Sequence, residues 1–389
     1  MSDNTPDSPE SPDSPDNNVL PSGARIENPA GDDIDAPKRV SRRGLLTGVG
    51  IGAAVVVAGG LGSWAFVRSQ PKKTANGLAV TTSWADKEIK ITSPSGVCEA
   101  PLIVAYEKGF FTKAGLNVKL LKTGDGENVV EAVGSGKYTA SNGIFFNYLD
   151  PIYNGTPVKL SGGLHHGCLD LYVKSDGPIS ELADLKGKKI GVTSLQGSST
   201  NYFSLDLLDV GINSSPEAKQ VEWVVISDQT LLPQALKDGK VDAIATAGGF
   251  LPIIQAVDDG WAKELSNNRD SSLSRNAKEP CCAVVLNEDF VSQDPVTAAK
   301  LVTAWAQGSR WAGNNLEATA ELESGTYVAG KPEEILPVLK TLTFDPSPKN
   351  LHQVLQPGIE KYIKTGFLPK DTNAKALADK AFADLGLNF

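Results

Sequence analysis

The segment Gly197-Ser198-Ser199-Thr200 combines a glycine with three hydroxyl-bearing residues at the predicted start of a helix. A glycine lets a ligand approach the backbone closely. The first turn of a helix presents unpaired N–H groups and the positive end of the helix dipole. We therefore expect this segment to bind a sulfonate, carboxylate or phosphate-like group. Helix capping without a ligand is the alternative.

A second loop of the same kind, Gly96-Val97-Cys98-Glu99-Ala100, precedes another predicted helix. Here Glu99 occupies the helix start, where its carboxylate would compete with an anionic ligand. The same carboxylate suits an ammonium group or another N–H donor. This loop therefore favours a zwitterionic ligand, a ligand with a cationic head, or a ligand with an N–H donor.

Aromatic and small residues follow two of the predicted strands, at 142–147 and 247–250, and aromatic rings there either stack on a flat ligand or pack in the core. His165 and His166 precede a further strand, where either lines a cleft or is an exposed histidine without a site role. The complete set of expected ligand-binding residues is Cys98, Glu99, Phe145, Phe146, Asn147, His165, Gly197, Ser198, Ser199, Thr200, Gly248, Gly249 and Phe250.

These residues belong to a weak internal duplication. Thr92-Ser93-Pro94-Ser95-Gly96 and Thr193-Ser194-Leu195-Gln196-Gly197 each follow an apolar run, and the segments 132–140 and 235–243 are similar to each other in the same order. Each unit reads as alternating strands and helices, a pattern typical of mainly parallel sheets covered by helices. We expect an α/β protein with two lobes. A single large doubly wound domain is the alternative.

Two strand-like runs at the unit boundaries, 168–173 and 281–286, are expected to be the crossings between the lobes. The predicted organisation is lobe 1 over 88–170, lobe 2 over 171–282, and a return to lobe 1 with C-terminal helices over 283–389. Those helices are expected at 295–314, 331–342, 348–364 and 373–385.

The composition limits the function. The chain has 389 residues, with 37 Lys and Arg against 46 Asp and Glu, so its formal net charge is −9. This balance argues against nucleic acid as a partner, because a nucleic-acid binder needs a basic face to neutralise phosphates. Residues 1–40 are acidic and rich in proline, and we expect a disordered cytoplasmic tail there.

Residues 41–68 read as an export signal. Arg42 and Arg43 precede an uncharged, glycine-rich run from Gly44 to Val67 that is long enough for a bilayer core. Paired arginines before such a run are typical of a twin-arginine signal. We expect export by this route to the extracytoplasmic face of the membrane, with the segment either cleaved or kept as an anchor, and a linker over 69–87.

Export favours disulfides among the four cysteines. If the two crossing strands are neighbours, Cys168 can bond to either Cys281 or Cys282, and because adjacent strand residues face opposite ways, only one of them is suitable. A thiolate and imidazole metal site from Cys98, His165, Cys168 and Cys282 is a second interpretation, although the spacing is not that of a zinc knuckle. We expect no metal and no cofactor.

The sequence resembles the substrate-binding proteins of ATP-binding-cassette importers, in the nitrate, sulfonate and taurine family that also includes thiamine-precursor binders. The resemblance is carried by Ala-Tyr-Glu-Lys-Gly-Phe-Phe at 105–111, Ala-Gly-Leu-Asn-Val at 114–118, Asp-Leu-Lys-Gly-Lys at 184–188 and Ala-Leu-Lys-Asp-Gly-Lys-Val-Asp-Ala at 235–243. It implies a two-lobed periplasmic-binding-protein-like fold of type II, with two crossing strands at the hinge and a small ligand in the cleft. It also implies a permease and an ATPase on other chains.

The expected function is therefore delivery of a small solute, such as a sulfonate, nitrate or taurine-like compound, to an importer by a monomeric protein that is not an enzyme. No nucleophile elbow, zinc-protease or P-loop motif occurs. The alternative is a thiamine-precursor (pyrimidine) binding or biosynthesis-type protein of the same fold, in which Cys98, His165, His166 and the vicinal cysteines have chemical roles. A membrane-tethered sensor is a third interpretation.

Overall fold

The computed structural model describes residues 79–124, 127–277 and 280–389. The expected acidic tail, the twin-arginine segment and the first part of the linker therefore lie outside the described residues. Within the described part of the chain, no helix combines the length and apolar character needed to cross a membrane.

The first lobe is built on a five-stranded sheet with the order β2-β1-β3-β10-β4. Its strands are β1 (Glu88–Thr92), β2 (Asn117–Leu121), β3 (Ala140–Ile144), β4 (Val158–His165) and β10 (Cys282–Asn287). β1 pairs in parallel with β2 and β3, whereas β10 runs antiparallel to both of its neighbours. All six residues of β10 are buried, so this strand is covered on both faces.

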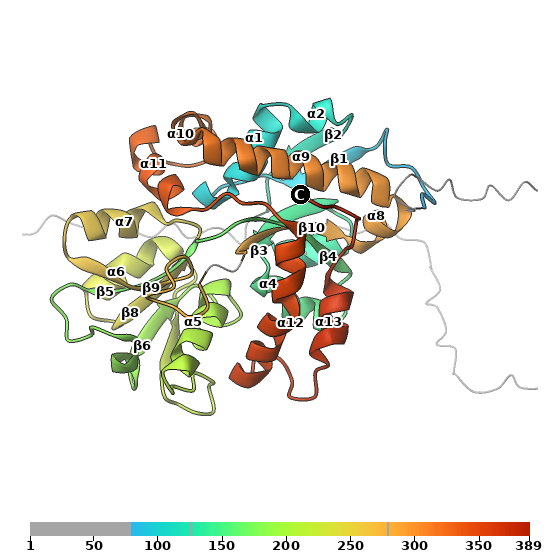
Figure 1. Ribbon diagram of the computed structural model, residues 1–389. Coiled ribbons are helices and arrows are strands. Elements are labelled where there is room, and N and C mark those ends of the chain that lie inside the picture. Colours follow the sequence, from blue (N-terminus) through green and yellow to red (C-terminus); the bar gives the residue numbers. More distant parts are fainter. Residues whose placement is uncertain (1–78, 125–126, 278–279) are drawn as a thin grey trace, which may run out of the picture. The chain divides into compact units, whose positions relative to one another are not determined.

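The second lobe repeats this plan with the order β7-β6-β8-β5-β9. Its strands are β5 (Leu169–Lys174), β6 (Lys189–Val192), β7 (Glu222–Val225), β8 (Ala243–Ala247) and β9 (Ala262–Asn267). Here β5 is the antiparallel strand, between β8 and β9. The duplication seen in the sequence is thus a duplication of sheet topology, with one antiparallel strand in each sheet next to the point where the chain changes lobes (Figure 1).

Helices cover both faces of each sheet. Those up to the second crossing are η1 (Val97–Glu99), α1 (Ala100–Glu107), α2 (Phe110–Lys113), α3 (Val129–Gly134), α4 (Phe146–Tyr153), η2 (Leu182–Leu185), α5 (Ser198–Asp209), η3 (Gln229–Leu231), α6 (Leu232–Lys237) and α7 (Leu251–Asp258). The C-terminal helices are α8 (Glu288–Gln293), α9 (Pro295–Asn314), α10 (Leu316–Glu323), α11 (Pro332–Thr341), α12 (Pro348–Thr365) and α13 (Ala374–Ala381).

Four of these C-terminal helices, α9, α11, α12 and α13, match the helices predicted from the sequence to within a few residues at each end. The predicted segment 373–385 ends earlier, at Ala381, where the backbone of Phe382 becomes extended. The prediction missed α8 and α10, which are only six and eight residues long.

Two apolar layers hold the first sheet. On one face, Ile89 and Ile91 of β1 pack with Leu102 of α1, Phe111 of α2 and Trp305 of α9. On the other face lie α4, α12 and α13, as Figure 1 shows. Because α12 contacts both β4 and α5, the C-terminal part of the chain packs against elements of both sheets.

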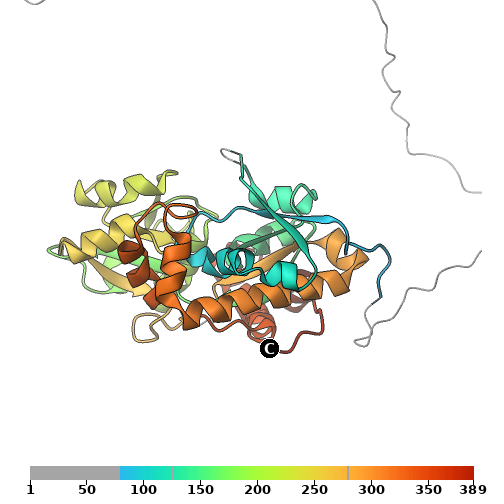
Figure 2. The ribbon, with the colours of Figure 1, turned by 90° about the horizontal axis from the view of Figure 1, so that it is seen from above.

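In the first lobe, α1 and α9 pack extensively against each other and lie side by side in Figure 2. Gly308 of α9 makes this possible, because a Cβ at this position would lie 2.3 Å from the carbonyl oxygen of Pro101. A backbone oxygen cannot move aside without moving α1.

We expect Gly308→Ala to destabilise the protein by about 1–3 kcal/mol through overpacking, although alanine is the better helix former by about 1 kcal/mol. The matched control is Gly358→Ala in α12, whose added Cβ would meet only Phe145 and Phe146 ring atoms at 3.8 and 4.0 Å. Urea unfolding should show a loss of stability for the first variant and none for the second. Equal stability of the two variants would contradict this packing.

Candidate functional site

A cavity of about 1130 Å³ lies between the two sheets, at the ends of strands from both. The side of the first lobe contributes the loops after β1 and β3, and the side of the second lobe contributes the loop before α5. The lining includes nine of the expected ligand-binding residues: Cys98, Glu99, Phe146, Asn147, Gly197, Ser198, Ser199, Thr200 and Gly248.

Four expected residues are not part of this lining. Phe145 is fully buried in the core, where its ring lies 4.0 Å from that of Phe146. Gly249 packs on α11, because a Cβ there would lie 2.3 Å from Val338, and Phe250 caps α7. His165 is also fully buried and lies with the cysteines described below.

On the side of the first lobe, Glu99 ends the short helix η1 and directly precedes α1. Its carboxylate accepts hydrogen bonds from the backbone N–H groups of Ser95 (2.7 Å) and Gly96 (3.0 Å). Burial raises the pKa of Glu99 above its usual value, against the opposing effect of these bonds and of Asn142. A carboxyl group held in this way can accept a proton from a ligand or share one with it.

On the side of the second lobe, α5 begins at Ser198. The N-cap is Gly197 with no side-chain hydrogen bond, so neither Ser198 nor Ser199 caps the helix. Both serines instead lie in the first turn and are 95% buried, with 5% exposure each. Thr200 donates its hydroxyl to the Ser194 carbonyl at 2.6 Å, which fixes the loop before the helix. The first-turn N–H groups have no partner within the helix and are directed to the cavity end of α5.

Three asparagines complete the polar lining. The side-chain oxygens of Asn142, Asn147 and Asn201 are buried and have no hydrogen-bond partner among the described residues. Buried polar atoms without partners are rare in folded proteins, so such a group of amide oxygens calls for an explanation, and a bound ligand is one. Sequence reasoning missed Asn201, and it placed Asn142 in the candidate segment 142–147 without including it among the expected ligand-binding residues. The available signal for Asn201 was its position, since it is the polar residue that directly follows Gly197-Ser198-Ser199-Thr200.

The aromatic residues of the lining join the lobes. The ring of Phe146 lies 5.2 Å from that of Tyr362 in α12 and 6.1 Å from that of Tyr202 in α5. Tyr148 lies across β3, since a Cβ on Gly143 would come within 2.5 Å of its hydroxyl. Flat apolar surface is therefore available beside the polar groups.

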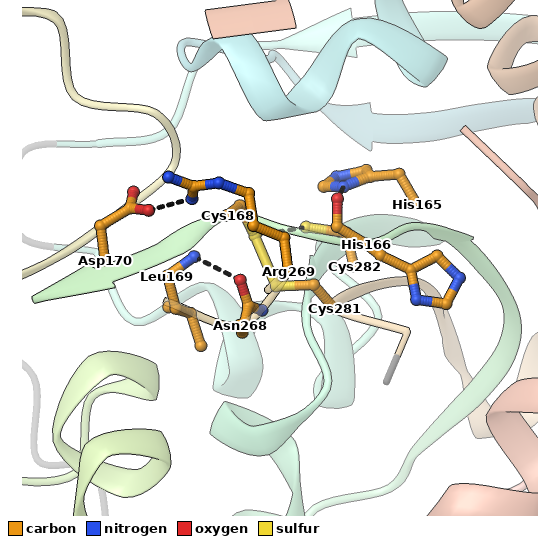
Figure 3. Close-up of a disulfide and its surroundings, with 9 residues drawn as sticks. All are labelled: His165, His166, Cys168, Leu169, Asp170, Asn268, Arg269, Cys281 and Cys282. Carbon is orange, nitrogen blue, oxygen red and sulfur yellow. Dashed lines mark hydrogen bonds and ion pairs between the residues drawn. A yellow bond between two sulfur atoms is a disulfide. The ribbon is translucent and has the colours of Figure 1, made fainter. Parts of the chain in front are cut away.

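Below the cavity, the structure joins Cys168 to Cys281, with 6.7 Å between their Cα atoms. Figure 3 shows that the bridge links the two segments in which the chain passes between the sheets. The sulfur of Cys282 lies 4.0 Å from that of Cys168. Both vicinal cysteines are thus close to Cys168, contrary to the argument from strand alternation, because β10 begins only at Cys282.

The second crossing is also tied by polar contacts near the bridge. The backbone N–H of Leu169 donates to Asn268 at 2.9 Å, and Arg269 forms an ion pair with Asp170 (Figure 3). Arg269 forms a second ion pair with Glu264. These contacts connect β5 and β9 with the segment that returns to the first lobe.

One buried carboxyl group near the cavity was not predicted. Glu323 of α10 is fully buried, and neither carboxylate oxygen has a hydrogen-bond partner among the described residues. Burial, with smaller contributions from Cys98 and Glu99, raises the pKa of Glu323 to about 9. The group is therefore protonated at neutral pH.

The NMT1/THI5-like family matches residues 99–318, more than half of the chain, a range that takes in all the predicted ligand-binding residues except Cys98. The chain belongs to the NMT1/THI5-like family. This agrees with the resemblance seen in the sequence, which named a group that includes thiamine-precursor binders.

Two curated relatives are synthases of 4-amino-5-hydroxymethyl-2-methylpyrimidine phosphate. The protein of Aspergillus parasiticus is 37% identical over 226 residues, covering 53% of this chain and 60% of that protein. The protein of Uromyces fabae is 27% identical over 228 residues, covering 54% and 61%. The matched segment is thus less than two thirds of these relatives. The expectation that the chain is not an enzyme is wrong on this finding, because the relatives are named as synthases.

Solved structures show the fold. The periplasmic aliphatic sulphonate binding protein SsuA of Escherichia coli superimposes with a TM-score of 0.62 at 14% identity, covering 77% of this chain and 92% of that one. The periplasmic nitrate-binding protein NrtA of Synechocystis gives a TM-score of 0.60 at 18% identity, covering 79% and 87%. The chain has the two-lobed α/β fold of periplasmic binding proteins, as predicted.

We expect the buried Glu323 to make stability depend on pH. Its pKa is higher in the folded protein than its usual 4.5, so the folded state binds the proton more tightly than the unfolded state. The protonated Glu323 therefore contributes fully to the free energy of unfolding below about pH 4.5. This contribution decreases by about 1.4 kcal/mol per pH unit as the pH rises toward about 9.

Chemical unfolding of the wild type and of Glu323→Gln from about pH 5 to about pH 9 tests this, because the effect of Glu323 on stability should change over roughly this range. The variant should lose less stability over this range, since glutamine does not ionise. The control is Glu321→Gln on the exposed side of the same helix, which should follow the wild type. Parallel curves for all three proteins would show that Glu323 is not held protonated.

Proposed function

We propose that the cavity binds a phosphorylated 4-aminopyrimidine of the thiamine-precursor class, and that the protein acts in the synthesis of this compound. The observation that carries the proposal is the pairing of two unlike ends in one cavity. Glu99 offers a carboxyl group at one end, and the first turn of α5 offers N–H groups at the other. The names of the curated relatives support the same chemistry.

The carboxyl end suits an aminopyrimidine. The exocyclic amino group of such a ring is a donor, and the adjacent ring nitrogen is an acceptor. A carboxyl group whose pKa is raised can accept from the first and donate to the second, as Glu99 can. The side-chain oxygens of Asn142 and Asn147, which have no partner among the described residues, add further acceptors beside it.

The opposite end suits a phosphate. The start of α5 presents its first-turn N–H groups together with the buried hydroxyls of Ser198 and Ser199. This helix has twelve residues and no acidic residue in its first turn, so nothing in the turn opposes an anion. Asn201, with its unpartnered oxygen, extends the polar surface along the helix.

The flat apolar surface between the two ends suits the ring itself. Phe146 and Tyr148 line the cavity on the side of the first lobe, and Trp223 and Phe367 line it elsewhere. Aromatic side chains of this kind stack on planar heterocycles. Closure of the lobes around the ring would exclude water from it.

Calorimetric titration with 4-amino-5-hydroxymethyl-2-methylpyrimidine phosphate tests the assignment. We expect one molecule bound per chain, weaker binding of the unphosphorylated pyrimidine, and a roughly 10- to 100-fold loss of affinity in Glu99→Gln, because a hydrogen bond to a charged or proton-sharing group is lost. Glu321→Gln, on the surface of α10, is the matched control and should bind as the wild type does.

Equal affinities of wild type and Glu99→Gln would show that Glu99 does not bind the ligand. Equal affinities for the pyrimidine with and without phosphate would show that the start of α5 does not bind the phosphate. No binding of either compound, with aliphatic sulfonates bound instead, would contradict the proposed ligand class.

Delivery of the pyrimidine to an importer is a second candidate function. Two observations favour it: the fold shared with ligand-binding proteins of periplasmic importers, and the twin-arginine-like segment at 41–68. In this case the protein is exported to the extracytoplasmic face of the membrane, and a permease and an ATPase on other chains receive the ligand.

Mass spectrometry of the small molecules released from the protein separates the two candidates. The protein is purified from its host without added pyrimidine and then denatured. Synthesis on the protein predicts that the pyrimidine phosphate appears even when the host lacks its own route to it. Delivery alone predicts that the pyrimidine appears only when it is supplied in the medium.

A further inference from the structure

Four metal-binding side chains meet below the cavity. They are Cys98 of η1, His165 at the end of β4, Cys168 in the first crossing and Cys282 at the start of β10. Their ligand atoms all lie within 4.8 Å of one another. All four residues are at least 92% buried, since the most exposed of them, Cys98, has 8% exposure. The cluster therefore joins one loop of the first lobe to both crossings.

His165 has a ring nitrogen without a protein partner. Its Nδ1 lies 3.3 Å from the backbone carbonyl oxygen of His166, whereas the buried Nε2 has no hydrogen-bond partner among the described residues. A histidine that binds a metal commonly donates one ring N–H to a carbonyl and binds the metal through the other nitrogen. The orientation of His165 has this form, with Nε2 left for a ligand.

The donor set selects a class of metal. Three thiolates and one imidazole are the ligands of tetrahedral zinc sites, whereas magnesium and calcium prefer oxygen. In such a site the ligand atoms lie roughly 3.5–3.8 Å apart. The Cys168 and Cys282 sulfurs, at 4.0 Å, are already close to this separation, and the remaining distances require contraction of about 1 Å at most.

We propose that Cys98, His165, Cys168 and Cys282 bind one Zn²⁺-like ion, and that they do so only when the Cys168–Cys281 bridge is reduced. In the bridged protein the sulfur of Cys168 is bonded to Cys281 and cannot serve as a thiolate ligand. Reduction by a dithiol breaks this bond, converts the dithiol to its own disulfide, and returns a thiol to each cysteine. The metal then displaces the thiol protons of its three cysteine ligands.

The metal site is adjacent to the cavity, because Cys98 and Cys282 belong to both. An ion held there would fix η1, which carries Glu99, to the two crossings. The proposal does not rest on the identity of the cavity's ligand. It uses the cluster that the sequence suggested as a second interpretation, and it replaces the expectation of no metal.

The test compares zinc binding by the full chain in two redox states. Thiol titration after denaturation defines the states, with two free thiols expected in the bridged protein and four after a phosphine reductant, because the chain has four cysteines. Zinc affinity is measured against a chromophoric chelator. We expect one Zn²⁺ per reduced chain, bound at least about 100-fold more tightly than by the bridged protein.

Two serine variants form a matched pair, since each removes one buried thiol. Cys281→Ser keeps all four ligands and loses the bridge, so after removal of the reductant under argon it should bind zinc as the reduced wild type does. Cys98→Ser keeps the bridge partners and loses one ligand, so its reduced form should bind at least about tenfold more weakly. Co²⁺ should give thiolate charge-transfer absorption only in proteins that bind zinc tightly.

Circular dichroism checks that each variant is folded, and His165→Gln takes the place of Cys98→Ser if that variant is not. Equal zinc affinity of bridged and reduced wild type would overturn the proposal. Equal affinity of the ligand variant and Cys281→Ser would also overturn it, since the ion would then be bound elsewhere on the surface. Four free thiols in the untreated protein would overturn the redox control.

Discussion

The chain passes between its two sheets twice, and the structure depends on the place where these passages meet. The first passage ends at Cys168 and the second at Cys281, and a disulfide joins the two residues. Next to the crossings, each sheet accepts one antiparallel strand, β5 in the second lobe and β10 in the first. This arrangement places the loop ends of both sheets on either side of one cavity, so a ligand there touches residues from distant parts of the sequence.

The cavity differs from the rest of the interior in how its polar groups are satisfied. Elsewhere, a buried carboxylate such as Asp206 is surrounded by donors from Ser266, Ser274 and Asn276. Around the cavity, the side-chain oxygens of Asn142, Asn147 and Asn201 have no partner among the described residues. Folding alone does not favour such groups, because each loses its interactions with water. A ligand with donors and acceptors of its own compensates for this loss.

Much of the fold could be predicted from the sequence. The repeated Thr-Ser-x-x-Gly loops after apolar runs mark strand ends, and glycines such as Gly109 and Gly211 mark helix ends. These signals are local, so they appear in the sequence. The helix start at Gly197 and the loop with Glu99 were found for the same reason, and both line the cavity.

The remaining features depend on tertiary contacts. Whether Phe145 faces the ligand or the core depends on packing that the sequence does not show, and the structure buries it fully beside Phe146. Glu323 belongs to α10, a helix that the sequence analysis did not predict, and its burial comes from the packing of that helix against α1 and α11. The activity named for the relatives entered the sequence analysis only as an alternative, because none of the enzyme motifs considered there occurs in the sequence and the fold is that of binding proteins.

The central claim is that a phosphorylated aminopyrimidine lies between Glu99 and the start of α5. A crystal structure of the protein with 4-amino-5-hydroxymethyl-2-methylpyrimidine phosphate tests it most directly. The account predicts the amino group within about 3 Å of the Glu99 carboxyl group and the phosphate on the first-turn N–H groups of α5. A pyrimidine bound with its phosphate away from α5, or bound outside this cavity, would contradict the account.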